Sequence, residues 1–270
     1  MRNLDLQLEE NVIYGLLGRN GAGKTTLLNM IAGGTFPNHG TIEVRGKTLG
    51  KGELPKEFCY IREKHKHFGG ARVIEVLQVA AKFHPHWNWA LAHELLRTFR
   101  LEPNKKMRQL SRGTESLVGN IIGLASRAPL TLFDEPVLGL DVLMRDKFYK
   151  ALLEDYANHP RTILLSTHLI DEIAPVAERI FIMEAGSILL HDEMDRIHTA
   201  AHLIRGHSEA VASFMAGKRV IYTETYGHGT IAAIYEKLND GDRQRAREMN
   251  ISIENLTLQK FFSYVIEGGH

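Results

Sequence analysis

The stretch Gly18-Arg19-Asn20-Gly21-Ala22-Gly23-Lys24-Thr25-Thr26 fits the pattern G-x-x-x-x-G-K-[ST]. Residues 12–17, directly before it, form a short apolar run that predicts a buried strand. Apolar residues at helical spacing follow from Leu27 onward. A strand, a glycine-rich turn and a helix together place free backbone N–H groups at a helix start, where they can face an anion. The stretch therefore predicts a phosphate-binding loop.

The residue types of this loop suit a nucleotide triphosphate. Glycines allow close backbone approach to the phosphates and accept positive φ angles. Lys24 can reach the β- and γ-phosphates, and the Thr25 hydroxyl can bind Mg²⁺. We therefore predict that all of residues 18–26 contact ATP. The alternative, an ordinary glycine turn before a lysine, explains neither the apolar strand nor the helix on the two sides.

Composition limits the remaining possibilities. The chain has 270 residues, 44% of them hydrophobic, which suits one or two domains with a sizeable core. The formal net charge of +1 does not favour nucleic acid as a partner. Cys59 is the only cysteine, so an internal disulfide is impossible and a reducing cytosol is the expected setting. No apolar run reaches the roughly 18 residues of a membrane-spanning helix.

Further buried strands alternate with helices along the chain. Residues 130–133 and 162–165 are apolar runs, and helical spacing is evident in residues 73–84, 88–100 and 112–128. Alternating polar and apolar residues predict strands at residues 4–8 and 41–45 as well. This order predicts an α/β fold of the P-loop NTPase class: a mostly parallel sheet core with antiparallel edge strands.

Polar residues follow these strands where a parallel sheet binds its ligands. Asp134 and Glu135 end one strand, and Ser166-Thr167-His168 end the next. Beside a phosphate loop, Asp134 can bind Mg²⁺ and Glu135 can polarise an attacking water. Ser111 is the predicted N-cap of a further helix, whose start again offers anion-binding N–H groups. Asp141 is the predicted N-cap of the long helix that follows the two acids.

These motifs, in this order, resemble the nucleotide-binding subunit of an ABC transporter. The resemblance covers residues 1 to about 200 and rests on residues 18–26, 110–114, 132–136, 139–141 and 166–168. It implies an ATPase that uses ATP and Mg²⁺. It implies that Glu135 and His168 are catalytic and that His168 contacts the γ-phosphate. The further residues that it implies bind nucleotide are Ser111, Gly113, Thr114 and Asp141. In the family, the signature of one subunit, here residues 110–114, closes over the nucleotide of the other.

The sequence departs from the family pattern at three places. Leu110-Ser111-Arg112-Gly113-Thr114 replaces the usual Leu-Ser-Gly-Gly-Gln, but keeps the serine and second glycine. Glu63 stands where most members have a glutamine, and we predict it as a third Mg²⁺ ligand beside Thr25 and Asp134. Members usually carry an adenine-stacking aromatic upstream of the first strand here. Either the native start lies upstream, or the base is held differently.

Residues 128–141, with the C-terminal segment, resemble bacterial type-2 ABC exporters of the drug- and peptide-resistance kind. This implies separate membrane permease subunits, a second identical or related ATPase subunit, and a cytoplasmic location on the inner face of the membrane. The transported substrate would be chosen by the membrane subunits. Two alternatives are a soluble ABC protein of translation or DNA repair and an ATP-dependent regulatory module. One phosphate loop and no heptad run disfavour the first.

We expect two domains. Residues 1–200 would form the ATP-binding domain, with a helical subdomain at about residues 72–127. Residues 201–270 alternate predicted strands and helices in the order β-α-β-β-α-β, followed by a terminal helix. This order predicts a small α+β extension of the split βαβ kind.

Overall fold

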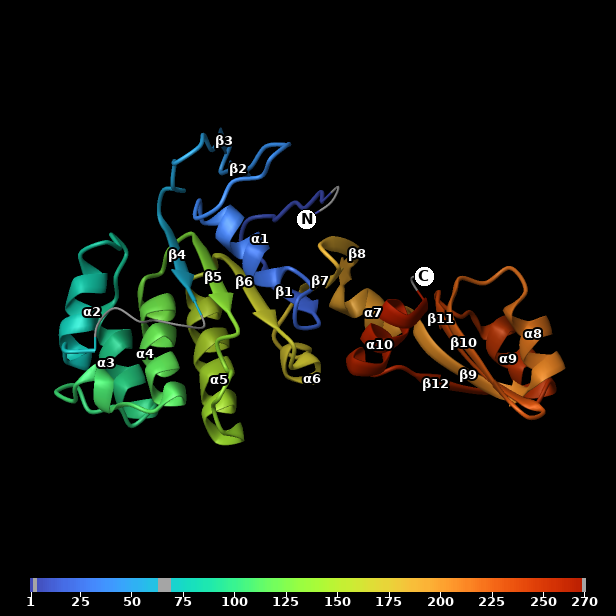
Figure 1. Cartoon of the computed structure of the whole chain (residues 1–270). Helices are drawn as coiled ribbons and strands as arrows, with labels where there is room; N and C mark the ends of the chain where they lie inside the picture. Colours follow the sequence, from blue (N-terminus) through green and yellow to red (C-terminus); the bar gives the residue numbers. More distant parts are fainter. Residues whose placement is uncertain (2–3, 63–68, 269–270) are drawn as a thin grey trace.

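A computed structural model describes residue 1, residues 4–62 and residues 69–268. In this part of the chain, six strands form the main sheet in the order β4-β5-β6-β1-β7-β8 (Figure 1). Their bounds are β1 Ile13–Gly18, β4 Phe58–Ile61, β5 Leu130–Asp134, β6 Thr162–Thr167, β7 Arg179–Glu184 and β8 Ser187–Glu193. The first five strands of the order are mutually parallel, and β8 is antiparallel to β7. The predicted parallel core with an antiparallel edge is confirmed.

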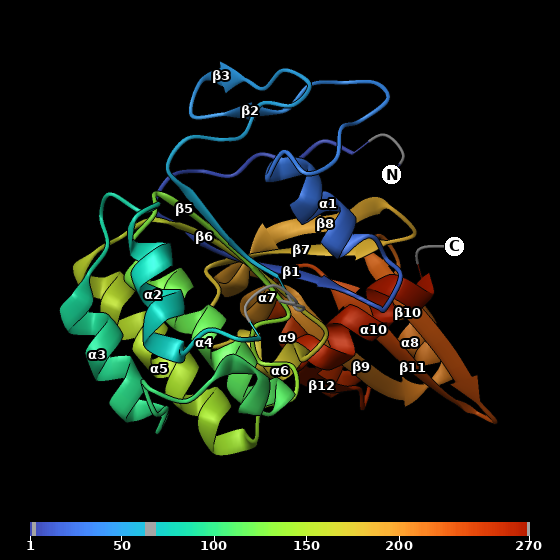
Figure 2. The same cartoon turned by 60° about the vertical axis from the view of Figure 1, so that its left-hand side comes forward.

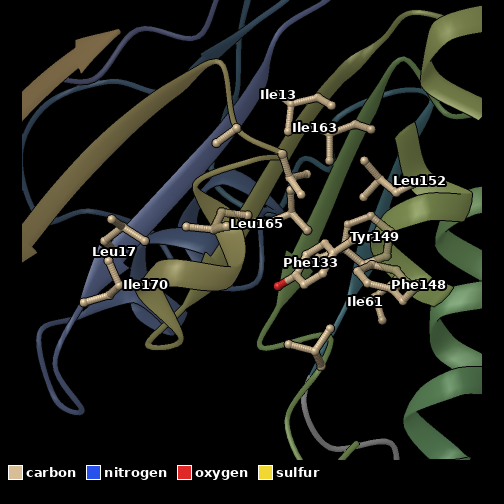
Figure 3. Packing of buried hydrophobic residues seen from close by; sticks show 14 of the residues in the cluster. Ile13, Leu17, Ile61, Phe133, Phe148, Tyr149, Leu152, Ile163, Leu165 and Ile170 are labelled. Carbon is tan, nitrogen blue, oxygen red and sulfur yellow. The ribbon is translucent and has the colours of Figure 1, made fainter. Parts of the chain in front are cut away.

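The period-2 alternation of strand side chains divides the core between the two faces of this sheet. Tyr14 and Leu16 of β1 pack with Leu27 and Leu28 of α1 (Lys24–Ile31) on one face. Ile13 and its neighbours on β5 and β6 pack on the other face, where Figure 3 shows them against α5 (Val142–Asn158). With helices on both faces, the β1 strand is fully buried, as its continuous apolar run predicts.

The predicted helical subdomain contains α2 (Val73–Ala81), α3 (Trp89–Thr98) and α4 (Arg112–Ala125), which lie together beside the sheet (Figure 2). A short 3₁₀ helix, η1 (Met107–Gln109), precedes α4. The Asn88 side chain accepts a hydrogen bond from the Leu91 N–H at 2.9 Å and caps α3. The short helix α6 (Ile170–Ile173) follows β6. Among the described residues, no helix is both long and apolar enough to span a membrane.

Two predicted edge strands are wrong. Residues 4–8 form no strand, although Leu4, Leu6 and Leu8 pack on the α1 side of the core. Residues 41–45 contribute only β2 (Glu43–Val44), which pairs with β3 (Lys47–Thr48) as a separate hairpin. The alternating pattern of residues 4–8 indicated correctly which side chains face the core. A side chain that faces the core does not by itself give the backbone a neighbouring strand for hydrogen bonding.

A second, antiparallel sheet has the order β10-β11-β9-β12, built from β9 (Ala201–His207), β10 (Val220–Tyr226), β11 (Gly229–Tyr235) and β12 (Ser252–Asn255). Helices α8 (Ser208–Met215) and α9 (Asp240–Glu248) supply the crossovers, so the chain order is the predicted β-α-β-β-α-β. The sequence pattern directly before residue 201 did not predict a helix, but α7 (Met194–Ala200) connects β8 to β9.

The terminal helix α10 (Leu258–Gly268) packs against β10, α6 and β8. One hydrophobic cluster accordingly contains Leu165 of the main sheet, Leu203 of the second sheet and Phe261 of α10. The boundary at residue 200 therefore separates two sheets that share a core, and the division into two domains stays a prediction.

Candidate nucleotide site

The loop of residues 18–23 connects β1 to α1 and is shaped by its glycines. A Cβ atom at Gly18 would lie 2.6 Å from the Met183 carbonyl oxygen, so only glycine allows this approach to β7. Gly23 has φ +108° and is the N-cap residue of α1. The Gly186 N–H donates to the Ala22 carbonyl at 2.8 Å, so the β7–β8 turn braces the loop. The loop therefore presents a fixed helix start at the carboxyl end of β1.

The Glu135 side chain contacts both Lys24 and His168. The Lys24 ammonium donates to the Gly18 carbonyl at 2.7 Å and lies 3.3 Å from Glu135 Oε1. The other carboxylate oxygen of Glu135 is 2.9 Å from His168 Nδ1. Lys24 and Glu135 are buried, with 6% and 8% of their surfaces exposed, so the attraction between them is only weakly screened. Glu135 thus sits between a phosphate-loop cation and the histidine of the adjacent strand.

Asp134 is the last residue of β5 and is 3% exposed. Its Oδ1 accepts a hydrogen bond from the Ser166 hydroxyl at 2.6 Å. Tyr60 of β4 lies on the same face of the sheet, and burial, followed by the charge of Asp134, raises the pKa of its phenol. The phenol therefore stays protonated beside the carboxylate. The Arg62 guanidinium lies over the Tyr60 ring, 5.0 Å from its centre.

The start of α4 is built as predicted. Ser111 is its N-cap, accepting from the Thr114 N–H at 3.2 Å, and the two hydroxyl oxygens are 2.7 Å apart. Gly113 packs on the turn after the two acids, where its added Cβ would lie 2.5 Å from the Gly139 carbonyl oxygen. The structure does not place Ser111, Gly113 or Thr114 in the Lys24 cluster. These residues lie at a separate helix start.

We expect Gly113→Ala to lower the free energy of unfolding by about 1–3 kcal/mol, the range for forcing extra volume into a packed site. The reason is that the clash at 2.5 Å is with backbone, which cannot rotate away. Gly70→Ala is the matched control, because a Cβ there meets nothing within 4 Å. Urea unfolding of the three proteins measures the effect, and equal midpoints for the two variants would contradict it.

The remaining predicted residues have these places. Asp141 caps α5 by accepting from the Met144 N–H at 2.9 Å, which confirms its capping role. Its predicted contact with nucleotide stays a prediction. Thr25 and Thr26 lie exposed in the first turn of α1, and Arg19 and Asn20 are exposed in the loop before it. Glu63, the third predicted magnesium ligand, lies outside the described residues.

The donor set near the loop suits magnesium. The Thr25 hydroxyl and the Asp134 carboxylate are hard oxygen ligands, which Mg²⁺ prefers. The described residues contain no group of three or more His, Cys, Asp or Glu side chains that could bind a metal alone. A magnesium ion needs only a few protein ligands when substrate phosphates supply its remaining ligands. The residues present therefore fit a metal that is bound together with a nucleotide.

A helix start that follows a glycine loop, a buried lysine at that start and an acid pair at the end of β5 define the P-loop ATPase class. The family model described as "ABC transporter" matches residues 1–138. The chain therefore belongs to the ABC transporter family, as an ATP-binding and ATP-hydrolysing subunit. Subunits of this family dimerise and work with membrane subunits.

Individual relatives agree with this assignment. The ABC transporter ATP-binding protein YtrB of Bacillus subtilis is 27% identical over 198 residues, 73% of this chain and 68% of that protein. The taurine import ATP-binding protein TauB of Escherichia coli is 31% identical over 190 residues, 69% of this chain and 74% of that protein. A solved structure of an ATP-binding subunit of an ABC transporter is 28% identical, with TM-score 0.64, covering 72% of this chain and 84% of that one.

Proposed function

We propose that this chain hydrolyses ATP with Mg²⁺ at the cluster of Lys24, Asp134, Glu135 and His168, and that it powers export through separate membrane subunits. The observation that carries the proposal is the placement of the Glu135 carboxylate between Lys24 and His168. A carboxylate next to the phosphate-loop lysine is within reach of a water that attacks the γ-phosphate.

Each residue would have a distinct role. The N–H groups at the start of α1 and the Lys24 ammonium bind the phosphates. The Thr25 hydroxyl and the Asp134 carboxylate would hold Mg²⁺, which neutralises charge on the β- and γ-phosphates. Glu135 accepts the proton of the attacking water, and His168 orients Glu135 through its Nδ1 contact. The phosphates and the Glu135 carboxylate compete for the Lys24 ammonium. Lys24 therefore moves away from Glu135 when phosphates bind.

The second half of the site would come from another subunit. Ser111, Gly113 and Thr114 lie apart from the Lys24 cluster of their own chain, at the N-terminal start of α4. An anion at that helix start is favoured by the helix dipole. Two subunits facing each other would therefore enclose each nucleotide between one Lys24 and the partner's α4 start. Closure around ATP would drive the membrane subunits, and hydrolysis would reset them.

Export is the proposed direction because the resemblance to type-2 exporters includes residues 128–141 and the C-terminal segment. The name of TauB states import, so the proposed direction rests on this resemblance alone.

Steady-state ATPase turnover, measured with and without the co-purified membrane subunits, tests this function. We expect Mg²⁺-dependent turnover that increases when the membrane subunits are present, because they promote closure of the subunit pair. Uptake of substrate into inside-out vesicles would then identify export. A chain that binds ATP but never turns over would instead support the regulatory module.

A further inference from the structure

Ser166 connects the two acids of the site. It is the fifth residue of β6, is 0% exposed, and lies directly opposite Asp134 in the β5–β6 register. Its hydroxyl donates to Asp134 Oδ1 at 2.6 Å. The Glu135 N–H donates both to the Ser166 hydroxyl oxygen, at 3.2 Å, and to the Ser166 carbonyl oxygen, at 3.1 Å.

The direction of these bonds follows from the groups involved. An ionised carboxylate can only accept, so the Ser166 proton must lie toward Asp134. The lone pairs of the Ser166 oxygen are then free to accept from the Glu135 N–H. The bond to the carboxylate is charge-assisted and lies in a buried place, which makes it stronger than a neutral one. A single hydroxyl therefore holds the side chain of one acid and the backbone of the next.

The backbone at Glu135 needs such support. Its φ angle is +51°, in the left-handed region that residues other than glycine adopt at a cost in energy. This conformation turns the Glu135 side chain toward Lys24 and His168. Because the N–H of Glu135 itself donates to both oxygens of Ser166, the unusual backbone and the direction of the carboxylate are fixed together.

We propose that Ser166 is a positioning residue that sets which Asp134 oxygen faces the metal and keeps Glu135 aimed at the phosphate loop. By donating to Oδ1, the Ser166 hydroxyl restricts rotation of the Asp134 carboxylate, whose other oxygen would then be available to hold Mg²⁺. Ser166 acts through the two acids, and the inference rests on the proposed function of those acids.

The variant Ser166→Ala separates this role from a structural one. It removes the hydroxyl, but the Ser166 carbonyl still accepts from the Glu135 N–H, so the strand end keeps a backbone bond. Loss of an outer partner of a metal ligand typically weakens metal affinity or activity about 10–100-fold. We therefore expect Ser166→Ala to weaken metal binding by at least about tenfold. ATP binding without metal should stay unchanged, because the side-chain hydrogen bonds that the structure describes for Ser166 go to Asp134 and Glu135 and not to the phosphate loop.

The measurement is binding of Mn²⁺, followed by electron paramagnetic resonance, to the full chain with a non-hydrolysable ATP analogue. Labelled ATP with a chelator present gives the metal-free affinity, and Mg²⁺ titration of ATPase turnover gives a second readout. Thr131→Val is the matched control. Thr131 is an equally buried strand residue whose hydroxyl bonds the Ala128 carbonyl at 3.2 Å, at the opposite end of β5. Ser166→Thr, which keeps a hydroxyl, should bind Mn²⁺ more tightly than Ser166→Ala.

The proposal is supported if Ser166→Ala binds Mn²⁺ more weakly than both the parent and Thr131→Val, while its metal-free affinity for ATP equals that of the parent. Mn²⁺ binding by Ser166→Ala that equals both the parent and Thr131→Val overturns it while leaving the ATPase function standing. A parent chain that binds no Mn²⁺ with the ATP analogue overturns the proposed function and this inference together.

Discussion

Replacing Glu135 by glutamine is expected to reduce ATP turnover by roughly 10²–10⁴-fold, the contribution of a general base. Glutamine has the size and hydrogen-bonding capacity of the parent side chain, but it cannot take a proton from water. It also removes the charge that holds the Lys24 ammonium at 3.3 Å. ATP phosphates then no longer compete with a carboxylate for Lys24, so ATP should bind at least as tightly as to the parent.

Initial-rate measurements of phosphate release at saturating ATP and Mg²⁺ give the turnover. The control is Glu57→Gln, which changes an exposed carboxylate paired with Arg45 at 2.9 Å and should leave turnover unchanged. A Glu135→Gln protein that hydrolyses ATP at the parent rate would falsify the role of Glu135 as the base.

Replacing Lys24 by alanine is expected to weaken ATP binding by roughly 10–100-fold. This corresponds to loss of hydrogen bonds from a charged group, about 1.5–3 kcal/mol. The loop glycines and the N–H groups of α1 remain, so binding is weakened and not abolished. Glu135 also loses its contact with the Lys24 ammonium and keeps its contact with His168.

Equilibrium titration with labelled ATP measures this change. The control is Lys47→Ala, which removes the same side chain from β3, where it pairs with Glu53 at the surface at 3.0 Å. Equal affinities of Lys24→Ala and Lys47→Ala would exclude residues 18–26 as the phosphate-binding loop.

The strand–loop–helix unit was predictable because its signals are local. Glycines at fixed spacing, Lys24 and the apolar runs on both sides all lie within about 20 residues. The C-terminal order of strands and helices was predictable for the same reason, since each element has its own period. The caps Ser111 and Asp141 needed only the residue type and the three residues that follow.

The features that were missed depend on partners far along the chain. Residues 4–8 have a strand pattern, but they pair with no neighbouring strand among the described residues. Ser166 was recognised only as part of the Ser-Thr-His motif, because its contact with Asp134 spans 32 residues and requires the β5–β6 register. The positive φ of Glu135 has no sequence signal, since left-handed backbone usually indicates glycine.

Size-exclusion chromatography of Glu135→Gln tests the central claim, a nucleotide enclosed between Lys24 of one subunit and the α4 start of another. The account predicts a dimer with ATP and Mg²⁺ and a monomer with ADP. It also predicts that adding Ser111→Arg abolishes the dimer, because a bulky cation would block the helix start that faces the nucleotide. A dimer that persists with Ser111→Arg, or one that forms equally with ADP, would contradict it.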